Sequence, residues 1–198
     1  MFLRRPIDDL LPRLQASIDG FDPDMALTFA TDAIIQFCRE SHLIRYVECF
    51  TPTDCATSLH LTKLKDDERL GEVLSLRLFN GKAKLDNVQL DYMVDGNTLY
   101  IDEMPCGVTT LELEYSVLPK RESDFIYDLL YEEWLEPIIH LTLHKLYMMA
   151  DTEWGNPNLS QWHLQAYEKA LYSARYRKIS KVKAIKPSLR PHRLSWGK

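Results

Sequence analysis

The residues with the clearest chemical potential lie on one predicted helix. Glu136, His140 and His144 follow one another at intervals of four, so a helix places all three on one face. Imidazole and carboxylate groups are ligands that Zn²⁺ accepts. The helix is otherwise apolar nearly all round, which is typical of a buried core element. Histidines there more often hydrogen-bond to backbone or carboxylate groups, so we predict a structural role and no metal site.

The four cysteines indicate no second site. Cys38, Cys49, Cys55 and Cys106 stand at irregular spacings without a C-x-x-C pair, which excludes the usual zinc-ribbon and redox motifs. No motif surrounds Cys49 or Cys55 as a nucleophile. We expect reduced intracellular cysteines that lie mostly in the core.

No enzyme motif occurs elsewhere in the chain. There is no glycine-rich phosphate loop, no G-x-S-x-G elbow and no H-E-x-x-H sequence, and only seven glycines are present. The carboxylates of Asp66-Asp67-Glu68 and Glu132-Glu133 are predicted to form a solvated loop and a helix surface. We therefore predict a protein that is not an enzyme, has no catalytic residue, metal or cofactor, and works by binding other proteins.

Length and composition place the chain among globular proteins. It has 198 residues, of which 45% are hydrophobic and 27% charged, enough for one domain with a sizeable core. It contains no run of about 18 apolar residues. The first nine residues turn acidic where a signal peptide needs an apolar stretch. We expect a soluble, unprocessed protein without a membrane partner.

Charge is distributed unevenly along the chain. Residues 175–198 contain nine Lys or Arg and no Asp or Glu, a charge of +9. The remaining 174 residues hold 15 basic and 29 acidic side chains, a charge of −14. A run of like charge resists compaction, so this tail is predicted to be extended and to bind something acidic. Nucleic acid, an acidic protein surface and the body of a neighbouring copy all qualify, and a solvated end without a partner is the alternative.

Helical spacing of apolar residues predicts two helices before residue 44. The first covers residues 7–14, and the second runs from Pro23 to about Glu40 with Asp22 as its N-cap. On the second helix Ile35 falls on the polar side, where an interface residue would lie.

Three more helices are predicted after residue 119. Two of them cover residues 123–134 and 138–150, and the last, capped by Asn156, reaches about Lys178. The predicted inner face of the last helix carries Leu159, Trp162, Ala166, Ala170 and Ala174. Its predicted outer face carries Tyr172 and Tyr176.

Between Ile44 and Val117 the hydrophobic period changes from 3.6 to 2, which predicts half-buried antiparallel strands. Asn80-Gly81 and Asp95-Gly96 are typical of tight hairpin turns. We predict an α+β fold, namely a bundle of about four helices with an inserted small antiparallel β unit. The predicted boundaries are residues 1–43 and 120–179 for the helical body, 44–119 for the β unit, and 180–198 for an extended basic C-terminal arm.

The order of motifs along the chain resembles one protein family. The motifs before and after the β insertion are Ile7-Asp8-Asp9-Leu10-Leu11-Pro12, Ala33-Ile34-Ile35-Gln36-Phe37-Cys38-Arg39-Glu40, Glu133-Trp134-Leu135-Glu136-Pro137-Ile138-Ile139, Leu146-Tyr147-Met148-Met149, Trp154-Gly155-Asn156-Pro157 and Tyr167-x-x-Ala170-x-x-x-Ala174-Arg175. Their order and spacing resemble the head-to-tail adaptors of tailed bacteriophages, the portal-binding connector or head completion proteins similar to tail tubular protein A. The likeness covers nearly the whole chain.

The resemblance implies a structural virion protein, assembled in the host cytoplasm. Such adaptors form a ring, usually of twelve copies, that lies beneath the portal, links the capsid to the tail and continues the DNA channel. The implied partners are the portal protein, neighbouring copies, a downstream tail or nozzle protein, and DNA that passes without sequence-specific contact. The implied portal-binding residues are Arg175, Lys178, Lys181, Lys183, Lys186, Arg190, Arg193, Trp196 and Lys198.

Hydrophobic side chains that are out of place on a solvated helix predict the subunit interface. These side chains are Ile35, Tyr172 and Tyr176. They lie on two different predicted helices, and a cyclic ring needs two different patches on each copy. The alternative function is a nucleic-acid-binding accessory protein that acts through its basic tail. Such an arm without a basic folded face binds only weakly and in a salt-sensitive way. An acidic body that lines a channel would instead repel phosphates and let DNA slide.

Overall fold

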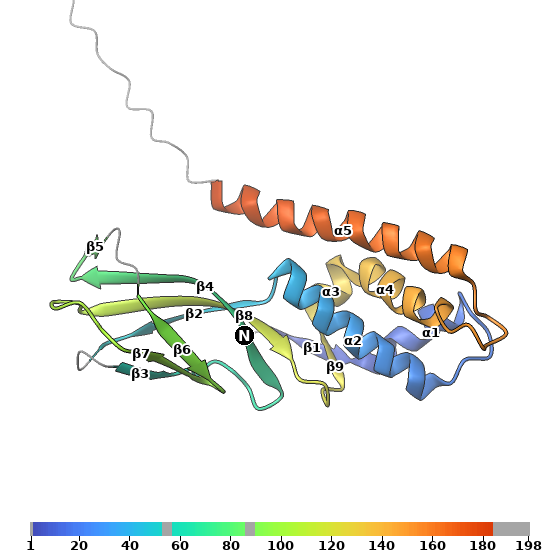
Figure 1. The fold of residues 1–198 in the computed structure, drawn as a ribbon, viewed down its shortest axis with the longest axis horizontal. Coiled ribbons are helices and arrows are strands. Elements are labelled where there is room, and N and C mark those ends of the chain that lie inside the picture. The colour runs from blue at the N-terminus through green and yellow to red at the C-terminus, as the bar shows by residue number, and fades with distance from the viewer. Residues whose placement is uncertain (1, 53–56, 86–89, 184–198) are drawn as a thin grey trace, which may run out of the picture.

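The structure, a computed structural model, describes residues 2–52, 57–85 and 90–183 (Figure 1). These residues form five α-helices, one short 3-10 helix and nine strands in three antiparallel sheets. The prediction of a helical bundle with a small β unit is wrong, because the strands make up a large part of the fold and one sheet lies within the predicted helical body.

The helices gather in one half of the molecule (Figure 1). They are η1 (Ile7–Leu10), α1 (Leu11–Gln15), α2 (Pro23–Ser41), α3 (Asp128–Glu133), α4 (Leu135–Tyr147) and α5 (Pro157–Lys183). Helix α4 contacts α2 and α5 and is buried along most of its length. Pro137 lies in the first turn of α4, where the missing N–H breaks no helical hydrogen bond. The N-cap prediction for α2 is confirmed, since Asp22 accepts a hydrogen bond from the amide of Asp24 at 3.1 Å.

Two sheets fill the other half. The four-stranded sheet has the order β2-β8-β4-β5, with β2 (Arg45–Phe50), β4 (Glu68–Asn80), β5 (Ala83–Leu85) and β8 (Thr110–Pro119). The three-stranded sheet has the order β3-β7-β6, with β3 (Thr57–His60), β6 (Tyr92–Asp95) and β7 (Thr98–Ile101). Both predicted hairpins are confirmed, because Gly81 and Gly96 turn with φ of 59° and 56° between paired strands.

A third sheet ties the start of the chain to its middle. Strand β1 (Arg4–Pro6) pairs with β9 (Phe125–Tyr127), and Arg4 lies opposite Tyr127. The predicted helix over residues 123–134 therefore begins only at Asp128. All three residues of β9 are buried, and so short a run carries no period that separates strand from helix.

One hydrophobic core joins the helical half to the sheets. Helix α2 packs on β8, and the fully buried side chains of Phe37, Ile44, Tyr115 and Tyr127 belong to the same cluster. Helix α5 ends at Lys183, so the first residues of the predicted extended arm are helical. Within the described part of the chain, no helix combines the length and apolar character that crossing a bilayer requires.

Candidate interaction site

Helix α5 packs against α4 with a different face from the predicted one. Its buried side chains are Ser160, His163, Tyr167, Leu171 and Ala174. Leu159 and Trp162, which were predicted to face inward, are 41% and 56% exposed. At 100° per residue, the observed inner face is rotated by about 80° from the predicted one.

The rotation follows from polar groups that find partners inside the α4–α5 contact. The Nδ1 atoms of His140 and His163 lie 2.9 Å apart, and the Ser160 hydroxyl lies 2.8 Å from Nδ1 of His144. A buried polar side chain with a hydrogen-bond partner is well tolerated. These residues therefore occupy an interface that hydrophobic spacing alone assigns to Leu159 and Trp162.

The same contacts decide the role of the histidines on α4. The side chain of Glu136 is 66% exposed and pairs with Arg13 at 3.4 Å, away from the paired histidines. Burial lowers the pKa of His140 and, together with its histidine neighbours, lowers the pKa of His163 to about 4. Among the described residues, no group of three or more His, Cys, Asp or Glu could hold a metal ion.

The outer side of α5 carries exposed aromatic rings, of which Trp162 at its flank also packs edge-on against His140 of α4, with ring centroids 5.5 Å apart. Trp162, Tyr172 and Tyr176 are 56%, 72% and 64% exposed, and in Figure 1 α5 lies at the margin of the molecule. They belong to a row with alternating spacings of four and three residues, which we call the outward stripe: Asn158, Trp162, Gln165, Lys169, Tyr172 and Tyr176. Such spacing keeps side chains on one helix face and is the pattern by which helices pack against one another.

The three predicted interface residues do not share one environment. Tyr172 and Tyr176 are exposed, whereas Ile35 is 5% exposed, so the expectation that Ile35 faces solvent is wrong. Ile35 lines a groove together with Arg69 of β4 and Lys145 of α4. These neighbours cover the flank of α2 that looks polar from helical spacing alone. An Ile35→Asp substitution would therefore disturb packing and would not test an interface.

The predicted portal-binding residues begin on α5. The Nε atom of Arg175 donates to the backbone carbonyl of Glu40 at 2.8 Å, which ties this part of α5 to the end of α2. Lys178, Lys181 and Lys183 lie within α5. The remaining predicted residues lie outside the described part of the chain: Lys186, Arg190, Arg193, Trp196 and Lys198.

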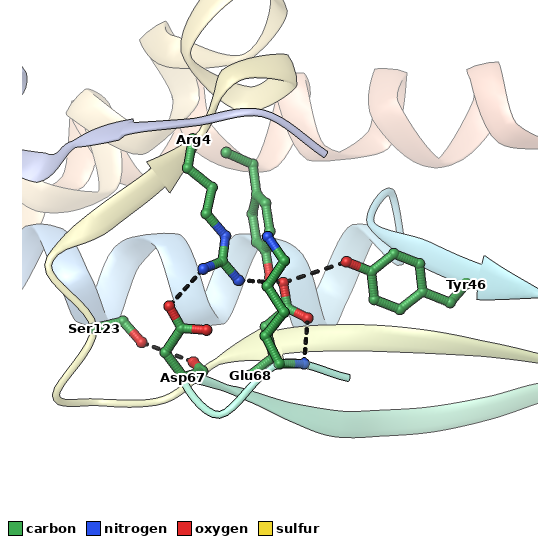
Figure 2. Close-up of polar contacts among 7 residues, drawn as sticks. Arg4, Tyr46, Asp67, Glu68 and Ser123 are labelled. Carbon is green, nitrogen blue, oxygen red and sulfur yellow. Dashed lines mark hydrogen bonds and ion pairs between the residues drawn. The ribbon is translucent and has the colours of Figure 1, made fainter. Parts of the chain in front are cut away.

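A buried carboxylate joins β1 to the β half (Figure 2). Glu68 has 0% exposure and accepts hydrogen bonds from Arg4 at 2.6 Å, from the hydroxyl of Tyr127 at 3.1 Å and from that of Tyr46 at 3.4 Å. Arg4 also pairs with Asp67 at 2.5 Å. The prediction that this acidic run forms a solvated loop is therefore wrong for Glu68.

This cluster is built to hold the fold together. Burial raises the pKa of Tyr46 to about 12 and also raises the pKa of Tyr127, so both phenols stay protonated donors at neutral pH. The Glu68 cluster therefore joins β1, β2, β4 and β9 through hydrogen bonds to one buried carboxylate.

Glu48 is a second buried carboxylate with a structural role. It accepts hydrogen bonds from the Tyr115 hydroxyl and from the Thr62 amide and hydroxyl. Burial alone would raise the pKa of Glu48, but these hydrogen bonds outweigh that effect and lower it. Glu48 thus stays ionised while it fixes the segment after β3.

The cysteines are less buried than expected. Cys38 lies in the core, whereas Cys49 on the edge strand β2 and Cys106 in a turn are exposed. Cys55 lies outside the described residues. Edge positions and turns leave one side open to solvent, which the composition of a chain does not reveal.

Comparison with known proteins adds no family to this picture. No protein-family model matches the chain, and no curated protein sequence matches it significantly.

Proposed function

We propose that the protein is a structural head-to-tail adaptor of a tailed bacteriophage, which forms a ring beneath the portal and links the capsid to the tail. The observation that carries the proposal is the outward stripe on α5, where Trp162, Tyr172 and Tyr176 expose large rings on a single helix face. Large exposed aromatic side chains in a row are typical of protein interfaces. The stripe therefore supports a protein that acts by packing against other chains.

The charge distribution supports the same proposal. In this proposal the outward stripe contacts a neighbouring copy, and the basic segment 175–198 contacts the portal. A charge of +9 without a single acidic residue suits an acidic protein surface. The body carries −14, which would repel DNA phosphates and suits the wall of a channel through which DNA passes.

The buried ionisable groups favour a binding protein over an enzyme. Glu48, Glu68 and His163 are each buried and each hydrogen-bonded to groups of the fold. A catalytic acid or base needs access to a substrate. These groups are instead enclosed by the residues that they position.

The stripe is tested by a triple substitution, Trp162→Gln, Tyr172→Gln and Tyr176→Gln. All three rings are more than half exposed, so the variant should keep the circular dichroism of the unaltered protein. Trp162 also makes edge contacts with His140 and His163, so the stability lost should come mainly from this residue, at about 0.5–1.5 kcal/mol per aromatic pair. It should fail to form rings on the portal protein of the same phage in negative-stain images. The matched control is Gln161→Ala with Glu168→Ala, two exposed residues beside the stripe, which should assemble normally. Normal rings from the triple variant would contradict the proposal.

The last part of the basic segment is tested by truncation after Lys183, which removes four of its nine basic side chains. The truncated protein should fold and should co-sediment less with the portal. Full portal binding by the truncated protein would show that residues 184–198 have another role. If truncation abolished DNA retention at moderate salt and left portal binding intact, the nucleic-acid-binding alternative would replace the adaptor.

A further inference from the structure

A groove of about 490 Å³ lies where α2, α4 and the start of β4 meet. Four cationic side chains line it, namely Arg39, Arg69, Arg121 and Lys145, with two acidic ones, Asp32 and Glu40. On a body with a net charge of −14 this is a local excess of positive charge. We call it the cationic groove.

The acids of the cationic groove are already engaged. Asp32 is shared between Lys145 at 3.8 Å and Arg121 at 3.9 Å. Glu40 accepts a hydrogen bond from the Tyr167 hydroxyl at 3.0 Å and lies 4.0 Å from the Arg175 guanidinium. Arg39 and Arg69 form no ion pair within the part of the chain that the structure describes, so the groove can accept further carboxylates.

A complementary surface lies at the far end of the helical half. We call it the acidic end, and it consists of the exposed residues Asp19, Asp22, Asp24, Asp151 and Glu153. The two connections that carry it lie together, because Asp19 and Glu153 line one hollow of about 400 Å³. No Lys or Arg occurs between Arg13 and Arg39 or between Lys145 and Lys169, so nothing in these stretches of sequence neutralises it.

Two acidic side chains elsewhere on the molecule already have partners: Glu132 pairs with Arg5, and Glu114 pairs with Arg45 at 2.7 Å. The acidic end cannot reach its own cationic groove, because Asp24 and Arg39 lie 15 residues apart on the straight helix α2, or about 22 Å. A contact between these two surfaces therefore requires two molecules.

We propose that the acidic end of one copy docks in the cationic groove of the next. This inference rests on the proposed function, because a ring is built from a contact between two different patches that repeats and closes. Helix α5 lies beside the groove, since Nε of Arg175 donates to the backbone carbonyl of Glu40, a residue of the groove wall.

Charge reversal tests the contact by sedimentation velocity over a range of protein concentrations at low ionic strength. Self-association of the unaltered protein should weaken as salt is added. Arg39→Glu with Arg69→Glu should weaken it at least about tenfold, because like charges would then face each other. Asp19→Lys with Glu153→Lys should do the same from the other side. A chain that carries all four substitutions should regain self-association, which also shows that the reversed variants fold.

A matched control separates the contact from an effect of net charge. Asp102→Lys with Glu103→Lys makes the same change of charge as the reversal of the acidic end, on exposed residues of the β half, and should leave self-association unchanged. A monomer at every concentration, or no effect of either reversal, would overturn the inference. If only the groove reversal weakened self-association, the proposed contact would also be overturned, and the groove would bind another anion. Retention of duplex DNA by the unaltered protein would then identify that anion as phosphate. Normal rings of both reversed variants on the portal would refute this contact and leave the adaptor proposal standing.

Discussion

Removal of Arg4 should expose how strongly the Glu68 cluster holds the fold. Arg4→Met keeps an unbranched stem beside the Phe125 ring, over which the guanidinium now lies at 3.8 Å from the centroid. It leaves the Glu68 carboxylate, with 0% exposure, without its cation. Breaking a buried ion pair from one side costs about 3–5 kcal/mol. Arg4 also pairs with Asp67, but that carboxylate is 41% exposed, and such a pair contributes about 1 kcal/mol or less.

The two ion pairs of Arg4 can be separated by urea unfolding followed by tryptophan fluorescence. Arg4→Met should lower the free energy of unfolding by about 3–5 kcal/mol, and the control Asp67→Asn by less than about 1 kcal/mol. The loss of unfolding free energy in the double variant Arg4→Met with Glu68→Gln should be smaller than the sum of the losses in the two single variants by at least about 1 kcal/mol. The reason is that the double variant leaves no buried charge in the cluster. Equal, small losses from Arg4→Met and Asp67→Asn would refute this reasoning. They would show that the tyrosine hydroxyls and a backbone amide alone satisfy Glu68.

Three further outcomes are expected. Asn156→Ala should lower the free energy of unfolding by about 0.5–2 kcal/mol in urea titrations, because Oδ1 of Asn156 accepts hydrogen bonds from two backbone amides of the first turn of α5 at 3.1 Å. Asn156→Asp should keep most of the stability that this cap provides. Gly155→Ala should lower the melting temperature in calorimetry, because a Cβ there would collide with the Met149 carbonyl oxygen; an unchanged temperature would show that this turn shifts freely. Folding favours the neutral form of His163, so the free energy of unfolding should be highest above pH 6.5 and should fall as the pH drops from 6.5 to about 4. His163→Phe should flatten that part of a plot of melting temperature against pH.

Local signals in the sequence predict two helix N-caps and both hairpin turns correctly. Asp22 and Asn156 cap helices through their own side chains, and Gly81 and Gly96 turn where positive φ is needed. Each of these features depends on residues within three or four positions of one another. All the groups that interact in these features are therefore close together in the sequence.

Several errors in the prediction involve partners that are distant in the sequence. His163 and Tyr167 are buried because His140 and Glu40 receive them, and Glu68 is buried because Arg4 lies opposite. Hydrophobic spacing assigns such side chains to the solvent-facing side. The predicted orientation of α5 was therefore rotated, and Trp162 was predicted to lie inside. The aromatic rings of the outward stripe were therefore only partly recognised. The alternating spacing of four and three residues was present in the sequence as the signal that could have found Trp162.

Pairing of β1 with β9 has a consequence for synthesis of the protein on the ribosome. Arg5 lies opposite Ile126, so the first strand has no partner until more than half of the chain has been made. At bacterial elongation rates of about 5–20 residues per second, this delay lasts roughly 6–24 seconds. During it Arg4 also lacks Tyr127 and the strand that complete its environment. The native core thus closes late, and until then apolar side chains that it later buries stay open to other chains.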